Sequence, residues 1–372
     1  MTKALTAIGL MSGTSMDGVD VAVLVTDGET IEALGPNGER PYSPAERDVL
    51  RAALGAAREL TDRTDRPGVL AEAEGIVTAA HAEAVEALLA AEDMSAADVD
   101  VIGFHGQTVL HRAERRLTVQ VGDGPALAAR LGVDVVYDLR AADVAAGGPG
   151  APFVPAYHRA IVRRQGWDLP VAVLNLGGVG NVTFVGEGDP VAFDTGPGNA
   201  LIDDWVARRA GIPFDEGGRI AAAGHVDAAV LAQLMDNAYF DRSPPKSLDR
   251  NDFSLDAVSG LSLEDGAATL AAFTAASVAA ARRWLPQPAR RWVVAGGGAR
   301  NPVLLSMLAE RLSVPVMTAD DAGLTASHIE AQAFAYLAVR SLKGLPLSFP
   351  TTTGVPEPMT GGVLATAAAS GR

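Results

Sequence analysis

The sequence contains no cysteine among its 372 residues. This absence excludes a disulfide framework, a zinc site built from thiolates and a cysteine nucleophile at the same time. Any catalytic chemistry must therefore use oxygen or imidazole groups.

The sequence also lacks long apolar runs and clusters of Lys or Arg. The opening residues, MTKALTAIGLM, do not have the apolar core and cleavage region of a secretory signal, and no apolar stretch is long enough to cross a bilayer. The formal charge is −15 and there is no basic run, which argues against a nucleic-acid partner. We therefore expect a cytoplasmic protein that binds neither membranes nor nucleic acids.

The composition is 48% apolar and 20% charged, as in globular enzymes. The length is about twice what one hydrophobic core usually organises, so two domains are expected. The acidic charge repels ATP at long range. A nucleotide site would therefore depend on local geometry, namely backbone amides in glycine-rich turns and a metal ion.

The chain opens with a pattern of strand, glycine-rich turn and strand. Residues 7–11 and 19–25 read as strands on either side of SGTSMDG. Asp27 and Gly28 predict a tight turn into a third strand that begins near Thr30. Helical patterns follow at residues 44–60 and 70–91.

The second half repeats this opening. Residues 171–174 and 182–185 read as strands around NLGGVGN, and GEGD predicts a hairpin turn. The repeat indicates a duplicated α/β unit with a phosphate-gripping hairpin in each lobe. Two unrelated hairpins are the alternative.

Residues 138–158, DLRAADVAAGGPGAPFVPAYH, fit a crossing between lobes or an active-site loop better than regular structure. We place the N-terminal lobe at residues 1–140 and the C-terminal lobe at residues 141–345. The tail, residues 346–372, is rich in Pro, Thr and Gly and is expected to pack back on the first lobe or to fray.

Residues 10–20, LMSGTSMDGVD, form the first motif that could carry chemistry. Its small residues let main-chain amides and the hydroxyls of Ser12, Thr14 and Ser15 approach phosphate oxygens. Asp17 could hold magnesium directly or through water. Taken alone, such a cluster between strands is more often a simple turn.

Residues 191–206, VAFDTGPGNALIDDWV, form the second motif. An apolar strand is expected to end on Asp194, and a Gly-Pro-Gly turn leads to Asn199 as the cap of a helix. A carboxylate beyond a strand end can act as a general base, which makes Asp194 the leading catalytic candidate. The alternative is an aspartate that only bonds its own loop.

Residues 292–312 form the third motif, a buried strand followed by Gly296, Gly297 and Gly298. Asn301 is expected to cap a helix that has Pro302 at its first position. The glycines permit close contact with a ligand or close packing of helix on strand. Beside two phosphate-type hairpins, an adenosine-contacting loop is the better interpretation.

Polar groups elsewhere suit a sugar substrate. An apolar strand leads into His105, Gln107 and Thr108, although a lone histidine is more often structural, and His111 more so than His105. Lys246 and Arg250, in PPKSLDRNDF, could contact a substrate carboxylate or phosphate, or could be solvated loop charges. Glu330 lies among apolar helix positions and could reach a cleft or pair with a base.

Seven ordered segments together resemble the anhydro-N-acetylmuramic acid kinase family: GLMSGTSMDGVDVA, GFHGQTVLHR, VVYDLRAADVAAGG with GAPFVPAYH, NLGGVGNVTF, FDTGPGNALID, PPKS and AGGGARNP. The resemblance covers Gly9 to Leu337 and implies a two-lobed, actin-like ATPase fold of duplicated ribonuclease H-like units around a nucleotide cleft. It implies that water opens the 1,6-anhydro bridge of 1,6-anhydro-N-acetylmuramic acid while O6 takes the γ-phosphate of ATP. The products would be N-acetylmuramic acid 6-phosphate and ADP, in peptidoglycan recycling.

The resemblance places the general base on Asp194, and we take Glu330 as a second catalytic candidate. It implies Mg²⁺ as cofactor, with Asp17 as its candidate ligand, and a homodimer. The expected ATP-binding residues are Ser12, Gly13, Thr14, Ser15, Met16, Asp17, Gly18, Val19, Asp20, Gly177, Gly178, Asn181, Gly296, Gly297, Gly298 and Asn301. The expected substrate-binding residues are His105, Gln107, Thr108, Arg140, Asp143, Gly196, Asn199 and Lys246.

Three positions depart from the family pattern. Ala142 and Pro149 replace an Arg and a Gln, which bears on substrate contacts, and Gly180 stands where a small or polar residue is usual. These changes keep open a kinase of the same fold that acts on a free sugar or polyol. A nucleotide-gated binding protein of the Hsp70 type is a third hypothesis, although the chain shows no separate peptide-binding domain.

Overall fold

The computed structural model describes residues 3–324 and 328–367. The chain divides into two compact units, residues 1–165 with 328–372 and residues 166–327. Both boundaries differ from those expected at residues 140 and 345. Helix α5 (Val154–Arg164) packs against α11 (Ile329–Leu342), so both helices belong to the first unit.

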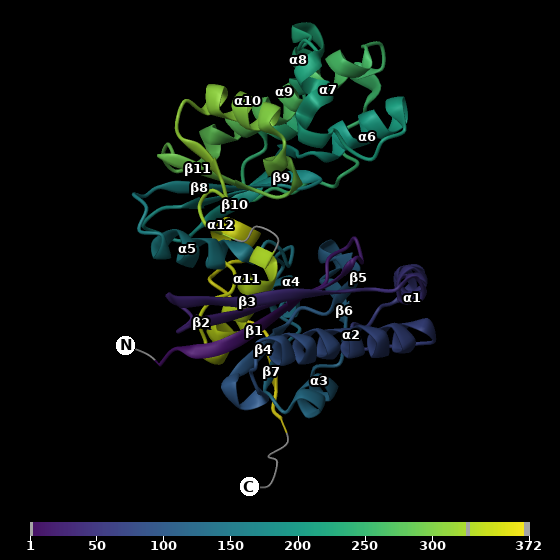
Figure 1. Cartoon of the computed structure of the whole chain (residues 1–372), viewed down its shortest axis with the longest axis vertical. Coiled ribbons are helices and arrows are strands. Elements are labelled where there is room, and N and C mark those ends of the chain that lie inside the picture. Colours follow the sequence, from purple (N-terminus) through teal and green to yellow (C-terminus); the bar gives the residue numbers. More distant parts are fainter. Residues whose placement is uncertain (1–2, 325–327, 368–372) are drawn as a thin grey trace. The chain divides into compact units, whose positions relative to one another are not determined.

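The first unit is built on a six-stranded sheet with the order β13-β7-β4-β1-β2-β3 (Figure 1). Strands β1, β2 and β3 are antiparallel neighbours, β4 is parallel to β1, and β7 is parallel to β4. The bounds are β1 Leu5–Met11, β2 Gly18–Thr26, β3 Ile31–Pro41, β4 Val101–Phe104, β7 Val135–Tyr137 and β13 Val363–Ala365. A separate hairpin pairs β5 Gln107–Arg112 with β6 Leu117–Val121.

The second unit repeats this topology in a five-stranded sheet with the order β10-β9-β8-β11-β12. Again three antiparallel strands are followed by two parallel ones. The bounds are β8 Val171–Leu176, β9 Val179–Val185, β10 Val191–Pro197, β11 Arg291–Ala295 and β12 Val316–Thr318. The shared topology confirms the predicted α/β fold of two related units and excludes two unrelated hairpins.

Helices cover both faces of the first sheet. Ile8 and Leu10 of β1 belong to a core with residues of α2, whereas Gly9 between them faces α11. A Cβ on Gly9 would lie 1.8 Å from the Ala331 carbonyl oxygen, so only glycine lets α11 approach β1 this closely. The helices are α1 Pro44–Ala56, α2 Val69–Ala91, α3 Gly124–Leu131, α4 Ala141–Ala145, α5, α11 and α12 Pro350–Thr353.

In the second unit, helix α9 (Leu263–Ala281) packs against β10 and several other helices. Its many alanines let these neighbours approach, and most of its residues are buried. The other helices are α6 Ala200–Ala210, α7 Arg219–Ala223, α8 Ala228–Met235 and α10 Pro302–Leu312. Within residues 3–324 and 328–367, none of the helices has the length and apolar character needed to span a membrane.

The segment 138–158 was expected to be irregular, and this expectation is wrong in part. It contains α4 and the beginning of α5, separated by residues 146–153. The alanine-rich stretches favour helix, and Pro155 lies in the first turn of α5, where no intrahelical N–H bond is lost. In the tail, β13 pairs with β7 of the first unit, and residues 368–372 lie outside the described residues.

Because His81 on α2 is buried, we expect the free energy of unfolding to fall in acid. Its side chain is fully buried, Nδ1 bonds the Val77 carbonyl at 2.7 Å, and burial lowers its pKa to about 4. The unfolded chain protonates this histidine near pH 6.5, so the stabilisation is complete above that pH and is lost as pH falls toward 4. Between pH 7.5 and pH 5 the wild-type chain should lose roughly 2 kcal/mol more unfolding free energy than the His81→Gln variant loses. Urea titrations of both proteins would show this, and an unchanged difference would contradict it.

Candidate functional site

The turn between β1 and β2 is fastened to the β4–β5 segment by Gln107. Ser12 is buried, and its Oγ donates to Gln107 Oε1 at 2.6 Å. The Gln107 Nε2 in turn donates to the Gly13 carbonyl at 3.1 Å. The hydroxyl of Ser12 and the amide of Gln107, both predicted to touch ligands, thus hold this turn in shape.

The remaining residues of the turn are open to solvent at its tip. Thr14, Ser15 and Asp17 are exposed, while Met16 is buried with a left-handed backbone. Behind them, Gly18 lies so close to β3 that a Cβ would meet the Arg40 carbonyl oxygen at 2.6 Å. The exposed hydroxyls and amides of this tip are the groups available to phosphate.

Val19 and Asp20 continue from this turn into β2. Val19 is buried in the core. Asp20 is half-buried, and burial raises its pKa while His328 opposes this effect. These two residues therefore form the base of the turn.

The first unit contains a cavity of about 240 Å³ that joins the first turn to the predicted sugar residues. It is lined by Met11, Ser12, Gly13, Thr14, His105, Thr108, His111, Arg140 and Ala151. His111 was expected to be more structural than His105. A β-bulge between Thr108 and Leu110 shifts the alternation of β5, which explains how Thr108 and His111, three positions apart, both line the cavity.

Arg140 supplies the positive charge of this cavity. Its Nε donates to His105 Nε2 at 3.0 Å, and a terminal nitrogen donates to the Gly150 carbonyl at 2.6 Å. Burial holds the pKa of His105 well below its usual range, so the neutral ring donates from Nδ1 to the Gly106 carbonyl and accepts at Nε2. Both of these bonds from Arg140 end on neutral acceptors, so neither bond neutralises its charge.

Glu330 and Asp143 act on Arg140 through their charges. Burial lowers the pKa of Arg140, and Glu330 and Asp143 oppose this effect. Glu330 lies exposed in the first turn of α11. Its carboxylate is thus close enough to Arg140 to influence the cavity electrostatically.

Asp143 itself is bonded within the first unit. The buried carboxylate accepts from the Gly150 amide at 2.7 Å and from the hydroxyls of Ser348 and Thr353 at 2.5 and 2.6 Å. It joins α4, the glycine-rich loop and α12. Asp143, which was predicted to bind substrate, therefore links these three segments.

In the second unit, Asp194 lies within β10 rather than at its end. The strand continues to Pro197, and a β-bulge falls between Asp194 and Gly196. The expectation of a strand end is wrong because the Gly-Pro segment still pairs with Gly180 and Val179 of β9. The bulge, rather than a strand end, re-aims the side chain.

Four hydrogen bonds hold Asp194. Its Oδ1 accepts from Asn181 Nδ2 and its Oδ2 from the Leu248 amide, both at 2.8 Å. Its own amide donates to the Lys246 carbonyl at 3.0 Å, and its carbonyl accepts from the Tyr239 hydroxyl at 2.6 Å. Burial raises the pKa of Asp194, while Asn181 and Leu248 oppose this effect. Asn181, predicted to contact ATP, is placed here as a partner of the carboxylate.

Lys246 holds the loop beside Asp194 by its backbone, and its side chain lies against aromatic rings. Its Nζ lies 4.4 Å from the Tyr239 ring centroid and donates to the Tyr239 carbonyl at 3.2 Å. Burial lowers the pKa of Lys246 to about 8. Arg250, the other loop cation, forms an exposed ion pair with Asp204.

The second glycine-rich turn is joined to the segment after Asp194. The Gly177 carbonyl accepts from the Asn199 amide at 2.7 Å, and the Gly178 carbonyl accepts from the Gly198 amide at 3.0 Å. Asn199 precedes α6 as predicted, but its side chain donates to Asp203 instead of capping the helix. Its backbone already has helical angles, which differ from the extended angles of a capping residue.

The third motif lines a cavity of about 280 Å³ within the second unit. Gly296 has a φ of 82°, and a Cβ there would lie 2.4 Å from Asn175 Oδ1. Asn301 caps α10 by accepting from the Val303 and Leu304 amides, as predicted. The lining residues are Val294, Gly296, Gly297, Ala299, Arg300, Thr318, Ala319 and Asp320. The buried Gly298 packs on Leu176.

Sequence reasoning missed Arg300 and the residues after β12 in this cavity. Thr318, Ala319 and Asp320 end or follow a strand parallel to β11, so they lie at the same sheet edge as Gly296. The polar residues after the apolar run VPVM were the available signal.

The model of one protein family, described as anhydro-N-acetylmuramic acid kinase, matches residues 5–367. The chain belongs to this family. Among curated relatives, the anhydro-N-acetylmuramic acid kinase of Methylobacterium nodulans is 56% identical over 370 residues, covering 96% of this chain and 99% of the relative. That of Nitrobacter winogradskyi is 56% identical over 362 residues, covering 97% and 99%.

Two solved structures that align with this chain share far less sequence with it than these relatives do. Component A of the Acidaminococcus fermentans (R)-2-hydroxyglutaryl-CoA dehydratase aligns at 14% identity and a TM-score of 0.47, covering 91% of this chain and 99% of that one. A ROK family glucokinase from Streptomyces griseus aligns at 16% identity and a TM-score of 0.41, covering 90% and 99%.

The carboxylates at the turn between β1 and β2 fit a magnesium ion whose other ligands are phosphate oxygens and water. No group of three or more His, Asp or Glu side chains suited to a metal occurs among the described residues. Asp17 is exposed and stands three positions before Asp20 in the sequence. Magnesium is commonly held by one or two carboxylates together with substrate phosphates and water, which agrees with this donor set.

Proposed function

We propose that the chain is an ATP-dependent kinase that hydrolytically opens the 1,6-anhydro ring of 1,6-anhydro-N-acetylmuramic acid and phosphorylates O6. The products are N-acetylmuramic acid 6-phosphate and ADP, and the setting is the recycling of peptidoglycan fragments. The family match across residues 5–367 carries this proposal. The bonding of Asp194 supports it independently.

Asp194 is the general base. It takes a proton from the water that attacks the anomeric carbon, and the released O6 attacks the γ-phosphate. A base works best when its pKa lies near the working pH, and burial raises the pKa of Asp194 in that direction. The bonds from Asn181 and Leu248 fix the direction of the carboxylate before substrate arrives.

The glycine-rich turns supply amides to the nucleotide. The exposed tip with Thr14, Ser15 and Asp17 suits the phosphates, and the cavity beside Gly296 and Gly297 suits the adenosine. Asp17 and Asp20 would hold Mg²⁺ directly or through water. When bound, Mg²⁺ supplies neutralisation of charge on the transferring phosphoryl group.

Arg140 selects the sugar. N-acetylmuramic acid differs from neutral amino sugars by a lactyl carboxylate, and Arg140 offers a guanidinium whose two described bonds end on neutral acceptors. Thr108 and His111 in the same cavity suit the sugar hydroxyls and the N-acetyl group. The Gly150 carbonyl that accepts from Arg140 directly follows Pro149, one of the positions that depart from the family pattern.

Homodimerisation and a cytoplasmic location complete the proposal. ATP is most abundant in the cytoplasm, which suits a kinase, and the family resemblance implies the dimer. Sedimentation of the purified protein at several concentrations reports the dimer directly.

The activity is tested by incubating the purified protein with ATP, magnesium and 1,6-anhydro-N-acetylmuramic acid, with N-acetylmuramic acid in a parallel reaction. Mass spectrometry should detect a product heavier than the anhydro-sugar by one water and one phosphoryl group. If N-acetylmuramic acid, the reducing sugar, is phosphorylated in preference to the anhydro-sugar, the result would favour a kinase of free sugars instead. Absence of any phosphorylated sugar from a folded sample would reject the proposal.

A further inference from the structure

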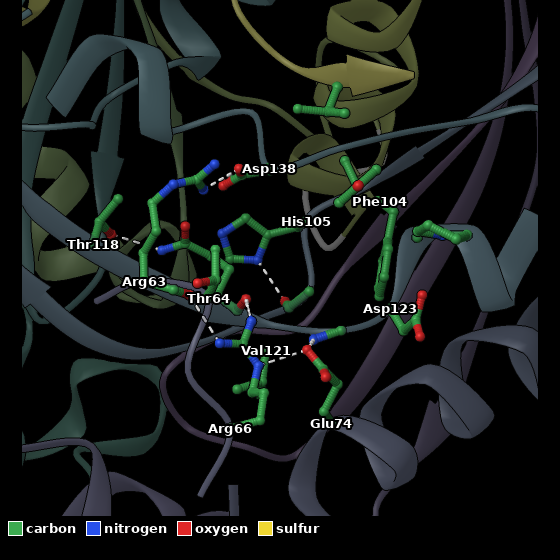
Figure 2. A pocket seen from close by; sticks show the side chains of 17 residues that line it. Arg63, Thr64, Arg66, Glu74, Phe104, His105, Thr118, Val121, Asp123 and Asp138 are labelled. Carbon is green, nitrogen blue, oxygen red and sulfur yellow. Dashed lines mark hydrogen bonds and ion pairs between the residues drawn. The ribbon is translucent and has the colours of Figure 1, made fainter. Parts of the chain in front are cut away.

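The first unit holds a second, larger cavity of about 400 Å³. The charged residues of its lining are Arg63, Arg66, Glu74, Asp123 and Asp138. In the view of Figure 2, the Arg63–Asp138 pair lies above His105 and the Arg66–Glu74 pair below it. Only His105 is shared with the cavity of Arg140, so the two cavities have otherwise separate walls.

Gln120 leaves one acceptor of this cavity unused. Its Nε2 donates to the hydroxyls of Thr118 and Thr108 at 2.8 and 3.2 Å. Its Oε1 is buried and has no hydrogen-bond partner among the described residues. A buried polar atom without a partner is destabilising, so an occupant that donates to Oε1 would remove this cost.

Asp138 is a second acceptor held under constraint. Its backbone has a φ of 55°, in the left-handed region that only a few residue types adopt readily. Its side chain is 13% exposed, whereas that of its partner Arg63 is 44% exposed and comes from the segment before α2. A partly buried carboxylate in an unusual backbone conformation, paired with a loop arginine, is typical of a functional position.

The chemistry of the lining selects the class of occupant. Three carboxylates and two guanidinium groups give a net negative charge, which disfavours phosphate and other anions. Gln120 Oε1 lacks a donor. The carboxylate of Asp138 bonds Arg63 through Oδ2 and can accept a further donor at Oδ1. The rings of Phe104 and Tyr137 offer apolar surface. A small ring that carries hydroxyl groups can donate to Gln120 Oε1 and lie against the rings of Phe104 and Tyr137. An amine on the same ring can pair with Asp138.

We propose that this cavity binds an unphosphorylated, hydroxyl-rich sugar of monosaccharide size, and binds it more tightly when the sugar carries a free amine. The site is distinct from the Arg140 cavity and does not depend on the kinase activity. The amine pairs with Asp138, and a hydroxyl donates to Gln120 Oε1.

The test uses glucosamine, glucose and glucosamine 6-phosphate as probes in calorimetry and saturation-transfer NMR with the full chain. Saturable binding is expected in the order glucosamine, glucose, glucosamine 6-phosphate. Asp138→Asn, which keeps the shape and tolerates the left-handed backbone, should weaken glucosamine about tenfold and reduce its advantage over glucose. Gln120→Leu should weaken both unphosphorylated sugars to a similar extent.

Glu86→Gln is the matched control. Glu86 lies on α2 as Glu74 does, but it pairs with Arg130 outside the cavity, so its removal should leave binding unchanged. Melting temperatures of all variants separate lost binding from lost folding. The proposal is overturned if the wild-type chain binds neither sugar, if glucosamine 6-phosphate binds as well as glucosamine, or if folded Asp138→Asn and Gln120→Leu variants bind like the wild type.

Discussion

Replacing Asp194 with asparagine should lower kcat/KM for the anhydro-sugar by roughly 10²- to 10⁴-fold, the usual cost of removing a general base. Asparagine can accept from only one of its two present side-chain partners, Asn181 and the Leu248 amide, but both backbone bonds of residue 194 remain, so the chain should still fold. It cannot take up the proton of the attacking water. The affinity for ATP should not change, because binding of the nucleotide does not require this proton transfer.

Steady-state kinetics and calorimetric titration with ATP measure these two effects separately. Asp204→Asn is the control, because it removes an exposed carboxylate from the same unit, where it pairs only with Arg250 among the ion pairs of the described residues. That variant should keep near-normal turnover. Near-normal turnover in Asp194→Asn would refute the assigned role.

Asn181→Ala tests the bonding of the base rather than the base itself. Asn181 lowers the pKa of Asp194 by stabilising the carboxylate, so its removal should raise that pKa. Because the base must be ionised, the acid limb of the kcat/KM profile should move to higher pH. A residue that only bound ATP would change KM for ATP and leave this limb in place.

Replacing Asp143 with alanine should lower the free energy of unfolding of the first unit by about 3 kcal/mol or more, because three donors lose a charged acceptor. The Gly150 amide and the hydroxyls of Ser348 and Thr353 would be left in a buried site. Hydrogen bonds to charged groups contribute roughly 1.5 to 3 kcal/mol each and are not additive.

Urea denaturation measures this loss, and hydrogen exchange at α12 should report early opening of that helix. Asp143→Asn is the conservative comparison, since its amide oxygen keeps part of the bonding, and it should cost less than alanine. Asp48→Ala removes an exposed carboxylate and should have little effect. A loss below about 1 kcal/mol for Asp143→Ala would show that Asp143 is not the link described here.

Lys246 and Asp143, both predicted to bind substrate, also form bonds that hold the fold together. Lys246 and Asp143 were assigned to substrate from the chemistry of their side chains. In the structure the backbone carbonyl of Lys246 accepts the Asp194 amide, and the carboxylate of Asp143 bonds segments more than 200 residues later. A charged side chain in a sequence does not reveal which neighbours will neutralise it.

Local patterns determined much of the architecture. The alternation of β1 and β2 around SGTSMDG, the turn at Asp27 and Gly28, and the cap at Asn301 all depend on residues within a few positions of one another. Backbone geometry over such short distances follows from the residues themselves, so these elements could be predicted. The repeated hairpins likewise revealed the duplicated unit.

Tertiary structure alone decided how Asp194 is held and which residues line each cavity. The Leu248 amide lies 54 positions from Asp194, and the bulge of β5 alone brings His111 beside Thr108. Backbone carbonyls occur at every residue and amide donors at every residue except proline, so a sequence does not show which of them will bond, and a bulge depends on the partner strand. The sequence was therefore sufficient to identify Asp194 as the candidate base. The orientation of its carboxylate depends on chain segments that only folding brings together.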